Sequence, residues 1–127
     1  MKEIKIISTQ DAPQAIGPYS QAICFNDLVF TSGQIPLNSK NEFMQDDIKG
    51  QTKQVLENLK AVLKEANIGL ENVVKTSVFL ANMEDFNAMN EVYESYFKDN
   101  KPARSTICVK ELPKKALVEI ECIAIIK

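Results

Sequence analysis

Hydrophobic and polar residues alternate along this chain in a pattern that predicts six strands and two helices. The expected strands, marked by alternation or by β-branched runs, cover residues 3–8, 22–25, 28–32, 73–80, 105–109 and 117–126. Helical periodicity runs from Asp46 or Asp47 to a stop at Gly69. A second helix is expected to run to about Phe97, with Asn82 as its N-cap and Asp85 as the N3 acceptor. The order βββαβαββ predicts a single α+β domain over residues 1–127, with two helices on one face of a mixed sheet.

Each helix carries one apolar stripe that is suited to packing on a sheet. In the first helix the stripe consists of Ile48, Val55, Leu56, Leu59, Val62, Leu63 and Ala66, and in the second of Phe86, Met89, Tyr93, Tyr96 and Phe97. Asn90 falls within the second stripe, where an aliphatic side chain is expected. Since a buried amide needs partners, Asn90 either fixes backbone groups or reaches a ligand.

The last strand places two carboxylates on one face. Alternation puts Glu119 and Glu121 opposite a row of apolar residues, in a run so hydrophobic that it predicts a central strand. Carboxylates there are costly unless they are paired or hydrogen-bonded. Two interpretations remain open: both pair with lysines at a subunit interface, or Glu119 handles a proton or a water molecule. Since two helices cover only one face of the sheet, we expect another subunit to cover the other.

Arg104 is the only arginine among the 15 Lys and Arg residues. Its planar guanidinium can make two parallel hydrogen bonds to a carboxylate or phosphate, which lysine cannot. Pro102 ends the preceding helix, so Arg104 lies at the start of a strand. This placement indicates either an anion clamp or an ordinary salt bridge.

Two loops also carry candidate groups. Tyr19 follows a stiff Gly-Pro corner, which indicates a side chain pointing into a cleft or one that is half-buried by packing. Gly33, after Ser32, permits other groups to approach the backbone closely, although ordinary loop chemistry explains it equally well. A two-residue turn at Asn26-Asp27 predicts a hairpin between the second and third strands.

Composition narrows the chemistry. The formal net charge of -2 is dispersed and gives no support to a nucleic-acid partner. No apolar run is long enough to span a bilayer, and residues 1–4 do not resemble a signal peptide, so we expect a cytoplasmic protein. The three cysteines, Cys24, Cys108 and Cys122, lie in apolar runs, which favours buried thiols over a zinc site or a disulfide framework.

Histidine is absent altogether, which removes Ser-His and Cys-His nucleophile pairs and most transition-metal sites. We therefore expect no metal and no cofactor, with any chemistry performed by carboxylate, tyrosine, arginine, backbone groups and water.

Four blocks of the sequence resemble the RidA family, also called the YjgF/YER057c/UK114 family, of reactive-intermediate deaminases. The blocks are residues 16–20 (IGPYS), 30–36 (FTSGQIP), 102–105 (PARS) and 118–121 (VEIE), so the resemblance covers essentially the whole chain. It implies a chorismate-mutase-like fold, a homotrimer and three clefts between subunits. It also implies hydrolysis of 2-iminobutanoate and 2-iminopropanoate, which pyridoxal-phosphate enzymes release as enamines, to 2-oxo acids and ammonia.

The resemblance also implies roles at matching positions. Arg104 would hold the substrate carboxylate in a bidentate pair, and Glu119 would hold the attacking water with help from the backbone at Gly33. Tyr19, the third of the implied catalytic residues, would pack near the substrate. Since an imine carbon is already electrophilic, positioning and one proton-relaying carboxylate would suffice. Burial would raise the pKa of Glu119 toward the useful range.

The remaining implied substrate-binding groups are Asn90, which would support the cleft, Ser32, and the backbone N–H of Thr106. Many members of the family have cysteine where this chain has Thr106, and the nearest thiol, Cys108, lies two residues on and on the same face of the strand. If the role belongs to the backbone, threonine changes little.

Two other functions are open from the sequence. One is a translation-inhibiting endoribonuclease, an activity attributed to some relatives, which the absence of histidine and of a basic stripe does not support. The other is a non-catalytic or chaperone-like member that binds small molecules in the same clefts. The combination of Arg104 and Glu119 favours the deaminase.

Overall fold

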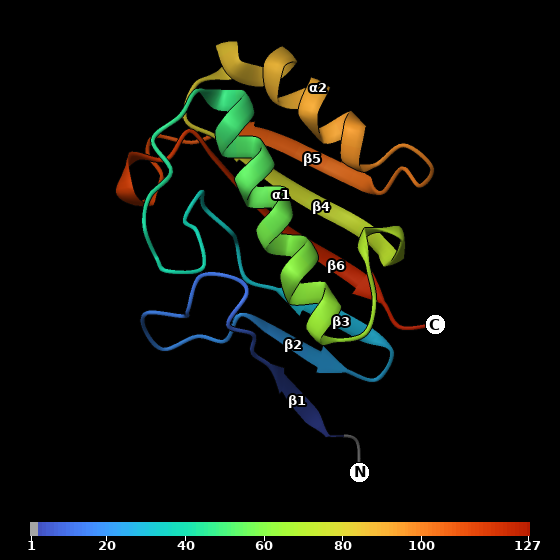
Figure 1. The fold of residues 1–127 in the computed structure, drawn as a ribbon. Coiled ribbons are helices and arrows are strands. Elements are labelled where there is room, and N and C mark those ends of the chain that lie inside the picture. Colours follow the sequence, from blue (N-terminus) through green and yellow to red (C-terminus); the bar gives the residue numbers. More distant parts are fainter. Residues whose placement is uncertain (1–2) are drawn as a thin grey trace.

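The computed structural model describes residues 3–127 and shows a six-stranded mixed sheet with two helices packed against it (Figure 1). The strands are β1 (Ile4–Ile7), β2 (Ala22–Phe25), β3 (Leu28–Thr31), β4 (Val73–Leu80), β5 (Ala103–Cys108) and β6 (Val118–Ile125). Their order across the sheet is β1-β2-β3-β6-β4-β5, in which β4 and β5 run parallel and the other neighbours antiparallel. The predicted α+β class and element order are confirmed.

The first helix, α1 (Ile48–Glu65), has a local closing contact at each end. The carboxylate of Asp47 accepts the backbone N–H three residues further on, at 2.9 Å. At the other end Asn67 adopts a left-handed conformation with φ 62°. The N–H groups of Asn67 and the next residue bond carbonyls of the last turn, at 2.9 and 3.1 Å. The predicted stop at Gly69 is therefore wrong, because Asn67 takes the left-handed position two residues earlier.

The second helix, α2 (Phe86–Tyr96), follows a 3₁₀ turn at Met83–Asp85. Asn82 was expected to cap the helix, but it precedes the 3₁₀ turn and its side chain makes no capping bond. The backbone carbonyl of Asn82 closes the turn instead, because it accepts a hydrogen bond from the Asp85 N–H at 3.1 Å. Of the expected stripe, Met89, Tyr93 and Phe97 are buried, whereas Phe86 and Tyr96 are half-buried. Two further 3₁₀ turns cover Leu70–Asn72 and Pro113–Lys115.

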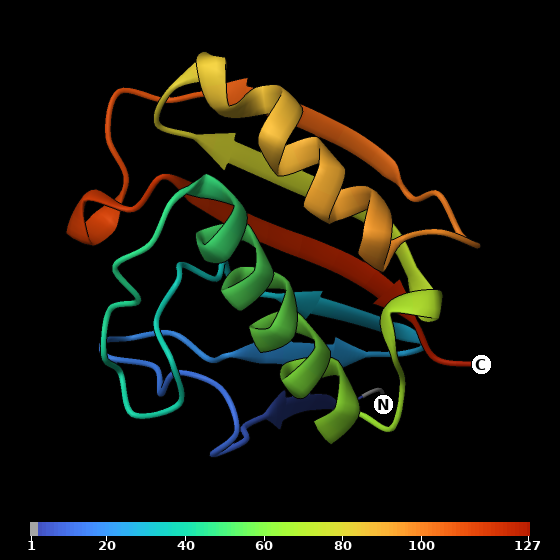
Figure 2. The same cartoon turned by 45° about the horizontal axis from the view of Figure 1, so that its top comes forward.

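Both helices lie over the same face of the sheet, with β1 and β5 at its two edges (Figures 1 and 2). The core lies between this face and the helices. Side chains of α1 and of the central strand β6 dominate it, and the fully buried ones include Val55, Leu56, Leu59, Val62, Leu63, Val118 and Ile120. The predicted helix stripe and the predicted central position of β6 are both confirmed.

The opposite face of the sheet carries no helix and leaves several apolar side chains exposed, beside charged ones that include Lys75, Glu119 and Glu121. Side chains there include Ile6, 70 % exposed, Phe30, 40 % exposed, and Ile107, 50 % exposed. Strand register places these residues on the same side as Glu119, because Glu119 and Ile107 both lie opposite Phe79 of β4. This side, called the open face below, is therefore uncovered within one chain.

The three thiols differ in their surroundings. Cys122 is buried, and burial raises its pKa to about 11, as expected for a small core residue. Cys24 is only half-buried. The prediction is wrong for Cys108, which is exposed because it ends the edge strand β5, where no further strand pairs with it.

The N-terminal segment 1–4, judged unlike a signal peptide, lies partly outside the described residues. Within residues 3–127, each helix is too short or too polar to traverse a lipid bilayer.

Candidate functional site

The guanidinium of Arg104 is held against one face of α2. Its Nη1 donates a hydrogen bond of 2.6 Å to the side-chain oxygen of Asn90. The guanidinium carbon also lies 4.7 Å from the ring centre of Tyr93 and 5.6 Å from that of Phe86. The side-chain oxygen of Asn90 thus orients the arginine instead of fixing backbone groups, the first of the two roles considered from the sequence.

The spacing of residues on α2 produces this arrangement. Phe86, Asn90 and Tyr93 are separated by four and then three positions, so they share one helix face. The hydroxyl of Tyr93 is 2.6 Å from that of Thr76 on β4, which fixes the ring. Burial raises the pKa of Tyr93, and the Thr76 hydrogen bond and Arg104 oppose that shift, so this phenol stays neutral at physiological pH.

Thr106 lies two residues beyond Arg104 on the same face of β5. Its hydroxyl oxygen is buried and has no hydrogen-bond partner among the residues that the structure describes. A buried hydroxyl without a partner is unusual and costs free energy. A polar group is therefore available beside the arginine.

Glu119 of β6 lies directly over the backbone of Gly33. A Cβ atom at position 33 would collide with the Glu119 carboxylate, whose carbon would be 2.9 Å away. Paired hydrogen bonds between Gln34 and Ile120, of 2.9 and 3.2 Å, hold the two segments side by side. Glycine at position 33 is thus required for this close approach, as one of the two interpretations of the sequence predicted.

Burial is the main cause that raises the pKa of Glu119, and the neighbouring carboxylate of Glu121 adds to it. Neither carboxylate forms an ion pair with any residue of the described chain. Glu119 is therefore a half-buried acid that gains and loses its proton at a higher pH than an ordinary glutamate. This property suits a group that relays protons.

A cleft of about 650 Å³ opens beside Glu119. Its lining includes Tyr19, Ser32, Gly33, Glu119, Glu121 and Lys114. Tyr19 is 53 % exposed, and its hydroxyl oxygen lies 3.4 Å from the backbone N–H of Ile16. The Ser32 hydroxyl donates to the carbonyl of Ser20 at 2.6 Å, so it shapes the wall of the cleft.

The predicted site residues fall into two groups on opposite faces of the sheet. Arg104 and Cys122 both lie opposite Thr76 of β4, whose side chain contacts α2, so Arg104 is on the helix-covered face. Glu119 lies on the open face with Gly33. Within one chain, Tyr19, Ser32, Gly33 and Glu119 share the cleft, whereas Arg104, Asn90 and Thr106 lie elsewhere.

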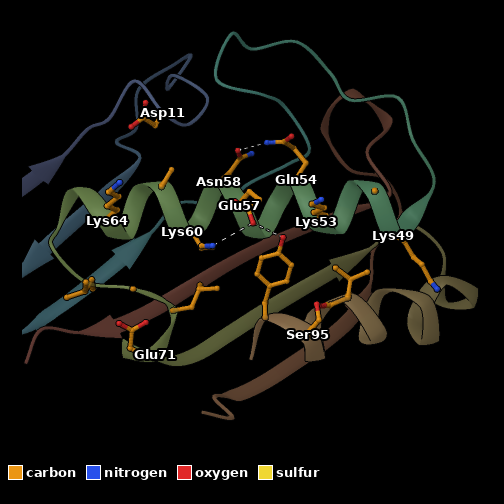
Figure 3. A pocket seen from close by; sticks show the side chains of 17 residues that line it. Asp11, Lys49, Lys53, Gln54, Glu57, Asn58, Lys60, Lys64, Glu71 and Ser95 are labelled. Carbon is orange, nitrogen blue, oxygen red and sulfur yellow. Dashed lines mark hydrogen bonds and ion pairs between the residues drawn. The ribbon is translucent and has the colours of Figure 1, made fainter. Parts of the chain in front are cut away.

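A larger hollow of about 1220 Å³ lies along α1 and α2 but contains none of the predicted site residues (Figure 3). Its central carboxylate, Glu57, accepts a hydrogen bond of 2.7 Å from Tyr96 and lies 3.8 Å from the Lys60 ammonium. At one end Lys49 pairs with Glu91 at 2.6 Å. These two ion pairs lie on an exposed surface, where such pairs contribute little to stability.

Three contributors were not assigned to the site from the sequence. Phe86 and Tyr93 were counted only as core residues, although their spacing around Asn90 already showed that all three share a helix face. Lys114 gave no signal, because its place at the cleft depends on a left-handed backbone, with φ 57°, in a short 3₁₀ turn.

Comparison with known proteins identifies the family of the chain. The family described as "Endoribonuclease L-PSP" matches residues 9–126. A RutC family protein of Pyrococcus horikoshii is 52 % identical over 125 residues, covering 98 % of each chain. The Reactive Intermediate Deaminase A of Arabidopsis thaliana chloroplasts is 46 % identical over 121 residues, covering 94 % of this chain and 65 % of that protein.

Solved structures show the same fold. A putative endoribonuclease of Thermotoga maritima superposes with a TM-score of 0.94 at 45 % identity, covering 97 % of this chain and 98 % of that one. E. coli TdcF with bound serine has a TM-score of 0.93 at 40 % identity, covering 97 % and 99 %. The chain therefore belongs to the endoribonuclease L-PSP family, the family of the YjgF and RidA proteins that its four sequence blocks resemble.

Proposed function

We propose that this protein hydrolyses small 2-imino acids, such as 2-iminobutanoate and 2-iminopropanoate, to 2-oxo acids and ammonia. The observation that carries the proposal is the orientation of the Arg104 guanidinium by Asn90 and Tyr93. This orientation leaves the other N–H groups of the guanidinium to donate hydrogen bonds to a carboxylate. The name of the Arabidopsis relative supports a deaminase. Serine, bound in the TdcF structure, carries the same α-carboxylate as an imino acid.

The chemistry needs few groups. Water adds to the protonated imine carbon, forming a C–O bond, while Glu119 takes a proton from that water. The carboxylic acid then returns the proton to nitrogen. As the C–N bond breaks, the hydroxyl group left by the added water becomes the C=O group of the 2-oxo acid, and its proton passes through the Glu119 carboxylate to the released ammonia, which leaves as ammonium. Because its pKa is raised, Glu119 is a stronger base than an ordinary glutamate in the first step and can return the proton as an acid in the second.

The proposed site is shared between two copies of the chain. Arg104 and Glu119 lie on opposite faces of one sheet, so a single copy cannot bring them to one substrate. The open face exposes several apolar side chains and is uncovered within one chain, which favours its burial by another copy. We propose a homotrimer in which Arg104, Asn90 and Thr106 of one subunit face the cleft of the next.

A coupled assay tests the activity. The purified protein is added to a threonine dehydratase reaction, and 2-oxobutanoate is expected to appear faster than by spontaneous hydrolysis. An unchanged rate would contradict the proposal. Incubating the same preparation with RNA, in the presence of a chelator, tests the ribonuclease alternative. RNA cleavage would favour the ribonuclease over the deaminase.

Subunit mixing tests the shared site. Arg104→Ala and Glu119→Gln subunits should each be inactive alone. Unfolding and refolding them together at equal amounts should restore about a quarter of wild-type activity. Subunits assemble at random, so about one site in four combines an intact Arg104 from one subunit with an intact Glu119 from the next. Continued inactivity of the mixture, with both variants folded, would place the whole site within one chain.

A further inference from the structure

The open face holds a second carboxylate to which the proposed mechanism assigns no role. Glu121 lies two residues after Glu119 on β6, so the two side chains leave the strand on the same face, about 7 Å apart at their origins. Both line the same cleft and both are half-buried. Two like charges at this spacing disfavour each other unless a cation stands between them.

No cation of the described chain pairs with them. Lys75 of β4 lies on the same face, near Glu121, but its ammonium donates instead to the Ser105 hydroxyl at 3.1 Å. Lys114 lines the cleft without forming an ion pair with either carboxylate. Within the described part of one chain the two carboxylates therefore lie on one strand face with no paired cation. The Arg104 that the proposed trimer brings from the next subunit is engaged by the substrate carboxylate.

The other groups around Glu119 add no positive charge beside the two carboxylates. The segment that carries Gly33 and Gln34 brings no titratable side chain, and β4 presents Phe79 opposite Glu119. Tyr19, from the N-terminal loop, brings a phenol ring to the same cleft. Glu121 is thus the anionic neighbour of Glu119 in the cleft.

We propose that Glu121 is a positioning residue that acts through Glu119, keeping the Glu119 carboxylate able to hold a proton at the pH where the protein works. This inference rests on the proposed deaminase function, since it assigns Glu121 a part in that reaction. The direction of the Glu119 pKa, raised by burial and then by Glu121, agrees with it. Without Glu121, Glu119 would be more completely ionised and a poorer donor of the proton that the leaving nitrogen needs.

The test compares wild type with Glu121→Gln, which keeps the shape of the side chain and removes its charge. The pKa of Glu119 is read directly by NMR of ¹³C-labelled glutamate carboxyls, and kcat/KM is measured across pH with the coupled assay. In Glu121→Gln both the Glu119 titration and the acidic limb of kcat/KM should move to lower pH by the same amount. Glu121→Asp should restore the wild-type profile.

Glu65→Gln is the matched control, because it removes one exposed carboxylate from α1, on the far side of the sheet. It should leave both profiles unchanged. An unmoved Glu119 titration in Glu121→Gln would overturn the inference. If wild type proved inactive, the proposed function would fail on the assay, while the NMR titration would still decide whether Glu121 controls Glu119.

Discussion

At the scale of single residues, Arg104 is oriented before any ligand arrives. Asn90 fixes one nitrogen of the guanidinium and the ring of Tyr93 supports its plane. A group that is held in this way loses less conformational freedom on binding, which strengthens ligand binding. Lysine has neither the planar fork nor the stacking surface, so the site is specific for arginine.

Replacing Arg104 by lysine should therefore lower kcat/KM by about a hundredfold, because the charge is kept but the substrate is misplaced. Steady-state kinetics with the coupled assay measures the loss, and circular dichroism checks the fold. Lys101→Ala, which removes an exposed cation just before β5, should keep full activity. Undiminished turnover in Arg104→Lys would count against the clamp.

Glu119 links function to stability. Because folding raises its pKa, the folded chain binds that proton more tightly than the unfolded chain does. The resulting contribution to stability is complete below the ordinary glutamate pKa and is lost as pH rises through the raised value. At neutral pH the wild-type chain therefore carries a carboxylate that disfavours the fold.

Glu119→Gln should accordingly have a higher free energy of unfolding than wild type at about pH 7, and the difference should shrink toward about pH 4. Urea denaturation at several pH values measures it. Glu65→Gln, an exposed change on α1, should show no such trend. A difference that is equal at both ends of the range would mean that Glu119 does not titrate abnormally.

At the scale of elements, the site depends on how the segment after β3 crosses β6. The bridge between Gln34 and Ile120 brings the chain beside the central strand, and Gly33 leaves room there for Glu119. Gly33 lacks the positive φ that would itself require glycine, since Gly17 is the glycine that has one. The need for glycine at position 33 is therefore steric and comes from Glu119.

Gly33→Ala should fold but lose most of its activity, because the new methyl group displaces the Glu119 carboxylate. Gly50→Ala is a matched control in α1, where the added methyl meets only the exposed carboxylate of Asp46. It should keep full activity and gain about 0.5–1 kcal/mol of helix stability. Activity assays and urea denaturation of both variants test the pair. Equal activities would show that the position of Glu119 is unimportant.

At the scale of the whole molecule, the two faces of the sheet are unequal. Both helices cover one face of the sheet (Figure 2). On the open face, Ile6, Phe30 and Ile107 are exposed. Exposed apolar side chains on a sheet face that no helix covers favour an interaction site. An assembly that covers it would also supply the arginine that the cleft of each chain lacks.

Phe30→Glu should therefore weaken self-association and lower activity together, because a charge is buried at the proposed interface. Met83→Glu is the control, since Met83 is 49 % exposed but lies in the 3₁₀ turn before α2, outside the sheet. Analytical ultracentrifugation and the coupled assay measure both properties. An active Phe30→Glu monomer would remove the need for a shared site.

Much of this molecule follows from local patterns. Alternation predicted the strands and the burial of alternate residues along β6, and the left-handed Asn26, with φ 57°, confirms the predicted hairpin turn. Errors arose where several residues compete for one local role. The helix α1 ends before Asn67 and not at Gly69, the predicted stop, and a 3₁₀ turn lies between Asn82, the predicted cap, and the start of α2.

The sequence by itself determined which residues are chemically unusual: a lone arginine, two carboxylates in an apolar strand, an amide in an apolar stripe and no histidine. Only the tertiary structure decided how they are grouped, with Arg104 beside Asn90 and Glu119 over Gly33 on the other face. The physical reason is that alternation gives the relative faces of residues within one strand. Which strands become neighbours, and in which register, depends on packing across the whole sheet.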